Sequence, residues 1–173
     1  EEHHVPKQRM FTYSLLKGLF SLGYRFLALE ALNIDSISSF SKIGVTAKMG
    51  YYTNEPNMAN LIRYAHKLGF TIVGYDCTNC RSIQERENYA ASNLGAIIKK
   101  ARNRKIVIHC GYGHGSKAAI GEFNMLGKIL KDSSGIEPVS VAQHIISRGC
   151  NLNFKNFIYD YLNHKGIKSS SVL

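Results

Sequence analysis

A chain of 173 residues, 45% of them hydrophobic, is long enough to form one domain with a substantial core. It contains no run of about 18 apolar residues, which excludes a membrane-spanning helix. The formal net charge of +10 would indicate nucleic acid as a partner only if the basic residues gathered on one surface. The densest basic run, from Lys99 to Lys105, instead lies where a helix should end, and cations stabilise helix C-termini. We therefore expect no nucleic-acid partner.

The four cysteines are too few and too widely spaced for a disulfide scaffold. Cys77 and Cys80 have the C-x-x-C spacing of redox and zinc sites, but no second such pair follows them. Free thiols or an incidental pair are the favoured interpretation, and a metal or redox role is the alternative.

In chain order, the first signals are a helix and a buried strand. Pro6 favours a helix start, and apolar residues recur at helical spacing over residues 6–22. The apolar run over residues 24–29 then predicts a strand that ends in Glu30. Between residues 31 and 54 the signals are mixed, which predicts a long excursion or a lid.

Two further pairs of helix and strand follow. A helix that begins at Glu55 precedes a strand over residues 70–75, and this strand ends in Asp76. A helix over residues 81–102 then precedes a strand over residues 105–108.

The rest of the chain has weaker signals. We expect a helix over residues 118–131, a short strand within residues 135–142 and a last helix over residues 153–163, before a frayed Ser-rich tail at residues 168–173. Alternating helices and apolar strands imply an α/β fold, with a mainly parallel sheet and helices on both faces. Residues 1–173 are expected to form a single domain.

Polar residues follow the predicted strands at the point where each strand ends. In such folds every strand-to-helix loop lies at the carboxyl edge of the sheet. Glu30, Asp76, His114 and Gln143 should therefore gather at that edge. Glu1 precedes a helix and belongs in another such loop, which predicts a further, central strand upstream of residue 1.

The glycine-rich loop after residues 105–108 resembles two familiar motifs, and each lacks a residue that it needs. A phosphate-binding loop of the G-x-x-x-x-G-K-[ST] type requires Lys before Ser or Thr, whereas the order here is Ser116-Lys117. A cysteine phosphatase of the H-C-x5-R type would begin at His109-Cys110, but Ser116 stands where the phosphate-clamping arginine should be. Both interpretations are disfavoured.

The favoured interpretation joins His114 of this loop to residues of other loops. Glu1, His4 and Glu30 should meet His114 at one edge of the sheet. Carboxylates beside imidazoles can activate water by general base catalysis, or they can hold a divalent metal. The competing interpretation is that Glu30 caps a helix and that His4 lies with His3 on the surface.

Several segments carry a resemblance to known proteins. Glu1-x-x-His4 is followed by Arg9 in the next helix, Glu30 ends a strand, and His114 follows a later strand. This order resembles the erythromycin esterase-like and ChaN-like superfamily, with TraB and TIKI proteins as more distant relatives. Further similar positions are Tyr52, Glu55, Pro56, Arg86, Glu87, Asn93, the segment from Gly135 to Pro138, and Gln143.

The resemblance implies a catalytic set in which Arg9 stabilises developing charge. Esterases of the superfamily carry a further histidine where Gly111 stands here, so the base would be His4, His114 or His109. The implied catalytic residues are Glu1, His4, Glu30, His114 and Arg9. The implied substrate-binding residues are Tyr52, Glu55, Asp76, Arg86, Tyr112 and Gln143.

The resulting hypothesis is a hydrolase that activates water with a cluster of Glu and His and cleaves an ester or amide in a small-molecule or peptide substrate. The alternative implied by the resemblance is a non-enzymatic binder of haem or metal. The candidate cofactors are therefore a divalent metal and haem, and oligomeric state is not predicted. A secreted, periplasmic or lipid-anchored location would follow if a signal upstream of residue 1 was removed. Metal ligands would be Glu1, His4, Glu30 and His114, and a haem binder would use His3, His4, Tyr112 and His114.

Overall fold

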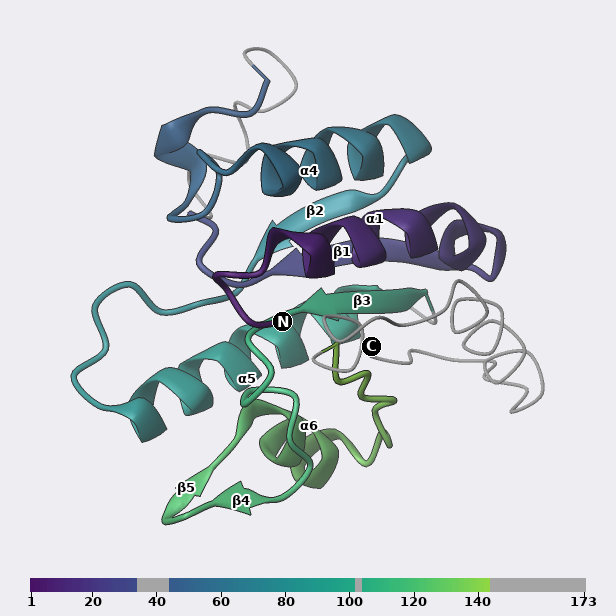
Figure 1. The fold of residues 1–173 in the computed structure, drawn as a ribbon. Helices are drawn as coiled ribbons and strands as arrows, with labels where there is room; N and C mark the ends of the chain where they lie inside the picture. The colour runs from purple at the N-terminus through teal and green to yellow at the C-terminus, as the bar shows by residue number, and fades with distance from the viewer. Residues whose placement is uncertain (34–43, 102–103, 144–173) are drawn as a thin grey trace.

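Three parallel strands form the main sheet of the computed structural model, which describes residues 1–33, 44–101 and 104–143. Leu29 of the middle strand pairs with Gly74 on one side and with His109 on the other. The strands therefore end level, and the residues that follow them emerge at one edge. The strand order is β2-β1-β3, with β1 at Tyr24–Leu29, β2 at Thr71–Gly74 and β3 at Lys105–His109 (Figure 1).

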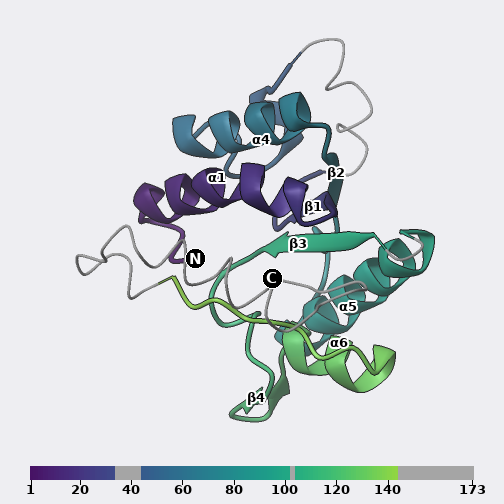
Figure 2. The ribbon, with the colours of Figure 1, turned by 90° about the vertical axis from the view of Figure 1, so that its right-hand side faces the viewer.

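The sheet carries helices on both faces, as predicted (Figure 2). The helices α1 (Pro6–Ser21) and α4 (Pro56–Leu68) lie together on one face, and α5 (Ile83–Lys100) and α6 (Leu126–Ser134) lie on the other. Together with the parallel strands, these two layers confirm the α/β fold class. Within the described ranges no helix is long and apolar enough to cross a bilayer.

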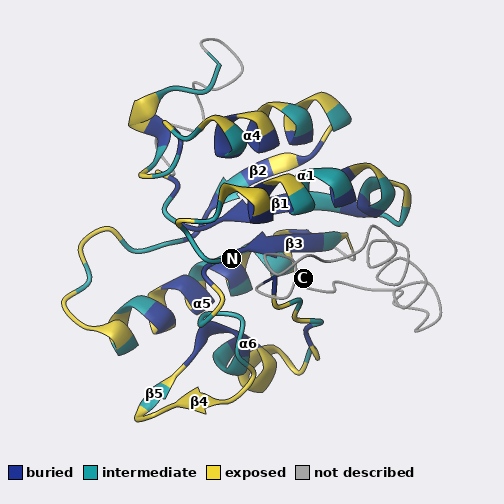
Figure 3. Cartoon of the chain, in the orientation of Figure 1, coloured by how far each residue is buried: buried dark blue, intermediate teal, exposed yellow. Residues whose placement is uncertain are grey.

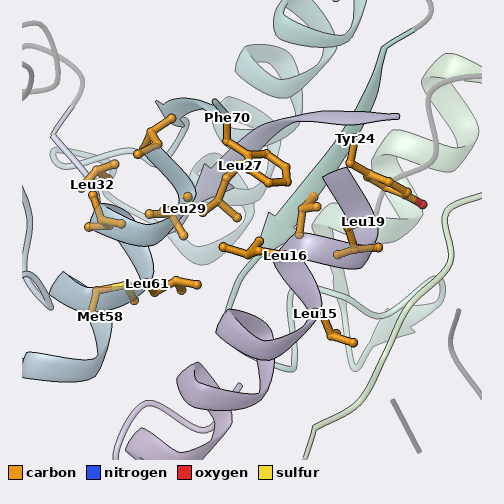
Figure 4. Close-up of a cluster of buried hydrophobic side chains, with 14 of the residues drawn as sticks. Leu15, Leu16, Leu19, Tyr24, Leu27, Leu29, Leu32, Met58, Leu61 and Phe70 are labelled. Atoms are coloured by element: carbon orange, nitrogen blue, oxygen red, sulfur yellow. The ribbon is translucent and has the colours of Figure 1, made fainter. Parts of the chain in front are cut away.

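Each face of the sheet has its own apolar core. Leu16 of α1 and Leu61 of α4 pack with Leu27 of β1 on the first face, and all three are completely buried (Figure 4). On the second face, Leu94 of α5 packs with Ile106 of β3. Burying one such side chain contributes about 1.5–3 kcal/mol. The buried sides of the helices accordingly face the sheet, while their outer sides are exposed (Figure 3).

Capping residues set the helix boundaries. Glu55 accepts hydrogen bonds from the backbone N–H groups of Asn57 and Met58, which starts α4, and Ser82 caps α5. Gly69 ends α4 in the left-handed conformation, at a φ of 94°. Because Glu55 follows the loop after β1, its cap also anchors that loop at the carboxyl edge.

The helix predicted over residues 118–131 is wrong in its first half. The strands β4 (Ala119–Ile120) and β5 (Phe123–Asn124) form an antiparallel hairpin there, and α6 follows it. Gly121 takes a φ of 60° in the two-residue turn, a conformation that favours glycine. Ala119 and Ile120 are exposed, so the apolar face that a helix would have buried does not exist.

The short strand predicted within residues 135–142 is also wrong, because no strand is found between residues 135 and 143. Val139 and Val141 pack instead against the core on the α1 face. Their alternation therefore reflects contact with a helix rather than pairing in a sheet.

Only the ends of the predicted excursion at residues 31–54 are described. Leu32 forms an antiparallel bridge with Gly50, and the short 3-10 helix η1 (Ala47–Met49) inserts Met49 into the core. Residues 34–43, the predicted last helix and the predicted frayed tail lie outside the described residues.

The middle strand of the described sheet is β1. Both of its edges are bonded, to β2 and to β3. The strand expected upstream of Glu1 could therefore join this sheet only at the outer edge of β2 or of β3.

Candidate functional site

Two buried glutamates form the centre of the carboxyl edge. Glu1 precedes α1 and Glu30 follows β1, and the residues are 6% and 8% exposed. Each carboxylate binds one arginine, which binds a second acidic residue in turn. The Glu1 centre consists of Glu1, Arg9, Glu55 and His109, and the Glu30 centre consists of Glu30, Arg86, Asp76 and His114.

In the Glu1 centre, Arg9 holds the carboxylate from α1. Its Nε lies 3.0 Å from Glu1 Oε2 and its Nη2 lies 2.9 Å from Oε1, while its Nη1 lies 2.9 Å from Glu55 Oε2. His109 Nε2 lies 2.9 Å from Glu1 Oε2. Burial alone would raise the pKa of Glu1, but the bonds from His109, His3 and Arg9 hold this pKa well below its usual range. Glu1 is therefore a charged carboxylate at neutral pH.

In the Glu30 centre, Arg86 binds both carboxylates. Its Nη2 lies 2.7 Å from Glu30 Oε1 and 2.5 Å from Asp76 Oδ2. The backbone N–H of Gly111 donates to Glu30 Oε2 over 2.5 Å. Burial alone would raise the pKa of Glu30, but the bonds from His114 and Gly111 lower it to about 2.

His114 lies between two carboxylates. Its Nε2 is 3.3 Å from Glu30 Oε1 and its Nδ1 is 2.5 Å from Glu87 Oε1. Burial alone would lower the pKa of His114, but the two glutamates outweigh burial and raise it to about 9. The imidazole is therefore protonated at neutral pH and supplies a positive charge rather than a base.

His3 connects the two centres. Its Nδ1 lies 3.0 Å from Glu1 Oε1, and its Nε2 lies 3.7 Å from Glu30 Oε1. The ring stacks on Tyr52, with centroids 4.7 Å apart and planes at 18°. The His3 side chain is 34% exposed, against 19% for His114 and 3% for His109. Of these imidazoles, His3 is the one that solvent reaches most easily.

A row of hydrogen bonds continues from the Glu1 centre into the interior. His109 Nδ1 lies 3.1 Å from Thr12 Oγ1, which accepts a bond of 2.8 Å from Gln143 Nε2. The Oε1 atom of Gln143 is buried and has no hydrogen-bond partner among the residues that the structure describes. With Glu1 on one ring nitrogen and Thr12 on the other, His109 is fixed in orientation.

Two predicted catalytic residues, His4 and Arg9, have positions that differ from that of His3 at the accessible side of the cluster. His4 is exposed in the turn before α1, and its neighbour His3 meets the carboxylates instead. Arg9 is 1% exposed, and its guanidinium donates to Glu1, to Glu55 and to the carbonyl of His3. Because these bonds occupy the guanidinium, we assign Arg9 the role of holding Glu1 rather than that of stabilising charge on a substrate.

The predicted substrate-binding residues belong to the two centres or border them. Asp76 and Arg86 pair with each other in the Glu30 centre, and Tyr112 is 64% exposed at the rim. Tyr52, Glu55 and Gln143 contact His3, Arg9 and Thr12, respectively.

Glu87 and Thr12 are parts of the cluster that the sequence analysis did not predict as site residues, although it named Glu87 among the positions similar to the superfamily. Glu87 is 1% exposed on α5, where it shares the buried face with Ala90 and Leu94. A charged residue in an apolar helical stripe is seldom buried without a partner, so this position carried a usable signal. Thr12 on the buried face of α1 is the polar counterpart.

Gly111 is the point where the glycine-rich loop passes closest to the cluster. A Cβ at this position would lie 2.9 Å from His3 Nε2 and 3.3 Å from both Glu30 Oε2 and His114 Cδ2. The imidazole of His3 therefore fills the space that a side chain at position 111 would need.

The donor atoms of the cluster do not fit a divalent metal. Both carboxylate oxygens of Glu1 accept hydrogen bonds from Arg9, and both ring nitrogens of His114 face carboxylates. Within the described part of the chain, no group of three or more His, Cys, Asp or Glu side chains could hold a metal ion. The same pairing occupies His3 and His114, two of the ligands expected for a haem binder.

The cysteines near the carboxyl edge do not provide a reactive thiolate. Cys77 and Cys80 form a disulfide in the loop after β2. Desolvation of the half-buried Cys110, followed in effect by the charge of Glu30, raises the pKa of its thiol to about 12. This further disfavours a cysteine phosphatase.

A cavity of about 220 Å³ opens beside the Glu1 centre. Its polar end is formed by Glu1, His109 and Gln143, and its walls come from α1, β3, α6 and residues 138–143. The apolar wall residues include Phe11, Leu15, Leu19, Val107, Leu126 and Leu130.

Comparisons with known proteins identify no relative of this chain. No family model matches the chain, and no curated protein or solved structure matches it. The resemblance to the erythromycin esterase-like and ChaN-like superfamily therefore stays a hypothesis that rests on the residues quoted for it.

Proposed function

We propose that the protein is a hydrolase that activates water at His3 and cleaves an ester or amide. The observation that carries the proposal is the position of His3, which is half-exposed between two charged carboxylates. A general base must combine access to the substrate with a fixed orientation, and His3 has both.

Glu1 would orient the base. Its carboxylate accepts from His3 Nδ1 over 3.0 Å, which leaves Nε2 as the nitrogen that takes a proton from water. This is the arrangement by which an acidic residue fixes the tautomer of a catalytic histidine. Arg9 keeps the Glu1 carboxylate ionised and in place, so it acts as a positioning residue.

Glu30 would hold the attacking water. A gap of 3.7 Å separates His3 Nε2 from Glu30 Oε1, which is long for a direct hydrogen bond, and a water beside the gap could bond to both atoms. Protonated His114 and Arg86 face the same carboxylate and would offset the negative charge that develops during attack.

The proposed base differs from the one that the superfamily resemblance implies. Esterases of that superfamily carry a histidine where Gly111 stands, and His3 Nε2 lies within 2.9 Å of the Cβ that such a residue would have. An imidazole at this point in space is thus supplied by another loop. This agreement in position supports the hydrolase proposal. Membership of the superfamily is likewise a proposal.

The test is an assay of the purified chain against a panel of chromogenic esters and amides. His3→Gln should lower kcat/KM by about 10²–10⁴, the usual contribution of a general base. His4→Gln removes the neighbouring, exposed imidazole and should leave kcat/KM within about twofold. Circular dichroism of both variants checks that the fold is retained.

Two results would overturn the proposal. One is a wild-type rate equal to the uncatalysed rate for every substrate in the panel. The other is an equal loss of activity in His3→Gln and His4→Gln, because general base catalysis at His3 predicts a difference between them.

A further inference from the structure

The amino edge of the sheet concentrates basic residues. The helices α1, α4 and α5 lead through short links into the parallel strands β1, β2 and β3, so these helices end where the strands begin (Figure 1). This edge lies opposite the carboxyl edge that holds the two glutamate centres. Its cations, which we call the basic edge, are Arg25, Lys67, Lys99, Lys100, Arg104 and Lys105. All of them except Arg25 and Lys105 are exposed.

The cations of the basic edge have no acidic partner among the described residues. None of them forms an ion pair there. No described Asp or Glu lies in the last turns of α1, α4 and α5, in the links or at the strand starts. By contrast, Lys117 and Lys131 share the carboxylate of Glu137. Within the part of the chain that the structure describes, the charge of the basic edge is therefore not neutralised.

The helix ends explain only part of this concentration of charge. A helix C-terminus carries a partial charge of roughly −0.5, so three of them offset about 1.5 positive charges and leave roughly +4.5. Tyr24, which precedes Arg25, pairs with Lys105. Adjacent strands lie about 4.8 Å apart, so neighbouring cations lie within the Debye length of roughly 8 Å and repel one another. An anionic partner would relieve this repulsion.

The arrangement of the cations favours a flat partner. Lys67 ends α4 on one face of the sheet and Lys100 ends α5 on the other, so the charges spread over both helical layers and the sheet between them (Figure 2). A bilayer that contains anionic lipids presents such a plane of negative charge. Duplex nucleic acid is instead recognised by an element that enters a groove.

The basic edge also lacks the aromatic surface on which single-stranded nucleic acid stacks its bases. Arg25 lies over the ring of Phe20, 3.9 Å from its centroid, and Lys105 lies over the ring of Tyr24 at 5.5 Å. Among the described residues, no exposed large hydrophobic side chain lies at this edge. Binding would therefore be electrostatic, without stacking and without insertion of side chains into the acyl layer.

We propose that the basic edge is a docking surface for a bilayer that contains anionic lipids, with Lys and Arg contacting the headgroups. The carboxyl edge, with its glutamate centres, then faces away from the membrane and stays accessible from solvent. The proposal does not depend on the hydrolase function, because it concerns the opposite edge of the sheet.

The experiment is co-sedimentation of the purified chain with vesicles of phosphatidylcholine, with and without about 30% phosphatidylserine. The chain should sediment with the vesicles that contain phosphatidylserine and remain in solution with the others. Binding should weaken as salt is raised from low to physiological concentration, because exposed charges are screened.

A triple variant tests the location of the surface. Lys67→Ala, Lys99→Ala and Lys100→Ala together should weaken binding to phosphatidylserine vesicles on the order of 100-fold, at about fivefold for each lysine. The matched control combines Lys117→Ala, Lys128→Ala and Lys131→Ala, which changes the net charge equally at lysines that have acidic partners. This control should bind within about fivefold of the wild type. Circular dichroism checks that both variants are folded.

Three outcomes would overturn the proposal. The first is equal sedimentation with both kinds of vesicle. The second is an equal loss of binding in the two triple variants, which would mean that net charge rather than the basic edge determines binding. The third is tighter binding to a DNA duplex than to phosphatidylserine vesicles at the same salt concentration, lost when Lys67, Lys99 and Lys100 are replaced, which would assign the edge to nucleic acid.

Discussion

The Glu1 centre and the Glu30 centre have the same plan in different surroundings. In each, a glutamate binds an arginine that binds a second acid, and a histidine donates to the glutamate. Arg9 in the first is 1% exposed, whereas the side chain of Arg86 in the second is 36% exposed. The same set of charges is thus held once by a buried arginine and once by an arginine that solvent reaches.

The difference indicates a division of labour around His3. A buried ion pair is rigid, and removing one partner leaves an unpaired charge in the interior. The Arg86 side chain is partly exposed, so solvent screens its ion pairs with the buried carboxylates more than it screens those of Arg9. We therefore expect the Glu1 centre to fix geometry and the Glu30 centre to face the substrate.

The largest expected effect compares the two arginines. Arg9→Met leaves the carboxylates of Glu1 and Glu55 without their guanidinium and should cost about 3–5 kcal/mol of unfolding free energy. Arg86→Met leaves the carboxylates of Glu30 and Asp76 without their guanidinium but removes a side chain that is 36% exposed, so it should cost less than Arg9→Met. Urea denaturation of both variants measures the difference, and equal losses would contradict the distinction between a buried and a partly exposed arginine.

The second effect is a pH dependence that belongs to the Glu30 centre. The pKa of His114 is raised from 6.5 to about 9, so the folded state holds its proton more tightly than the unfolded state. The stabilisation is complete below pH 6.5 and is lost as the pH rises through about 9. We expect a fall on the order of 2 kcal/mol across this interval.

Urea denaturation at several pH values measures this fall, and His114→Gln is the control. The variant cannot titrate at this position, so its stability should change much less between pH 6.5 and 9. Parallel curves for the wild type and the variant would assign the pH dependence to another group.

A smaller effect concerns the space where the two centres meet. Gly111→Ala places a methyl group 2.9 Å from His3 Nε2 and should displace the half-exposed imidazole. Activity should fall at least about tenfold, while stability should fall by only about 1 kcal/mol. In Gly113→Ala the nearest atom, Met125 Cε, is 3.8 Å away, so this variant should resemble the wild type in both assays.

The smallest effect is expected from metal removal. Dialysis against a chelator should leave both the hydrolysis rate and the unfolding midpoint unchanged, because the lone pairs of the Glu1 carboxylate are bonded to Arg9, His3 and His109. Loss of activity that zinc or another divalent cation restores would contradict this assignment and favour the metal-binding alternative.

The sequence predicted the sheet edge better than it predicted the side chains on it. Apolar runs that end in Glu30 and Asp76 gave both strand positions and loop placement, because parallel strands end at one edge. The choice between His3 and His4 depends on the turn before α1, where one residue of difference reverses the direction of a side chain. Hydrophobic periodicity contains no information about such a turn.

Two other features of the structure could not be predicted from the pattern of apolar and charged residues. The spacing of apolar residues favoured a helix over residues 118–131, but Gly121 forms a turn and Ala119 and Ile120 are exposed. The sequence could not show that Arg9 is buried and holds Glu1 in place. An arginine near two acidic residues can either bind a substrate or form ion pairs that stabilise the fold. Only the distances to Glu1 and Glu55 distinguish these roles.

The close approach of Gly111 to His3 has a consequence for how such a cluster can change in evolution. An imidazole at this point can come from the loop before α1 or from the loop after β3, but not from both, because the space holds one ring. A histidine could therefore move along the chain while the reaction centre stays in place. Sequence alignments compare residues by their position in the chain. In two proteins related by such an exchange, the equivalent histidines would therefore not be aligned with each other, although both rings occupy the same place in the structure.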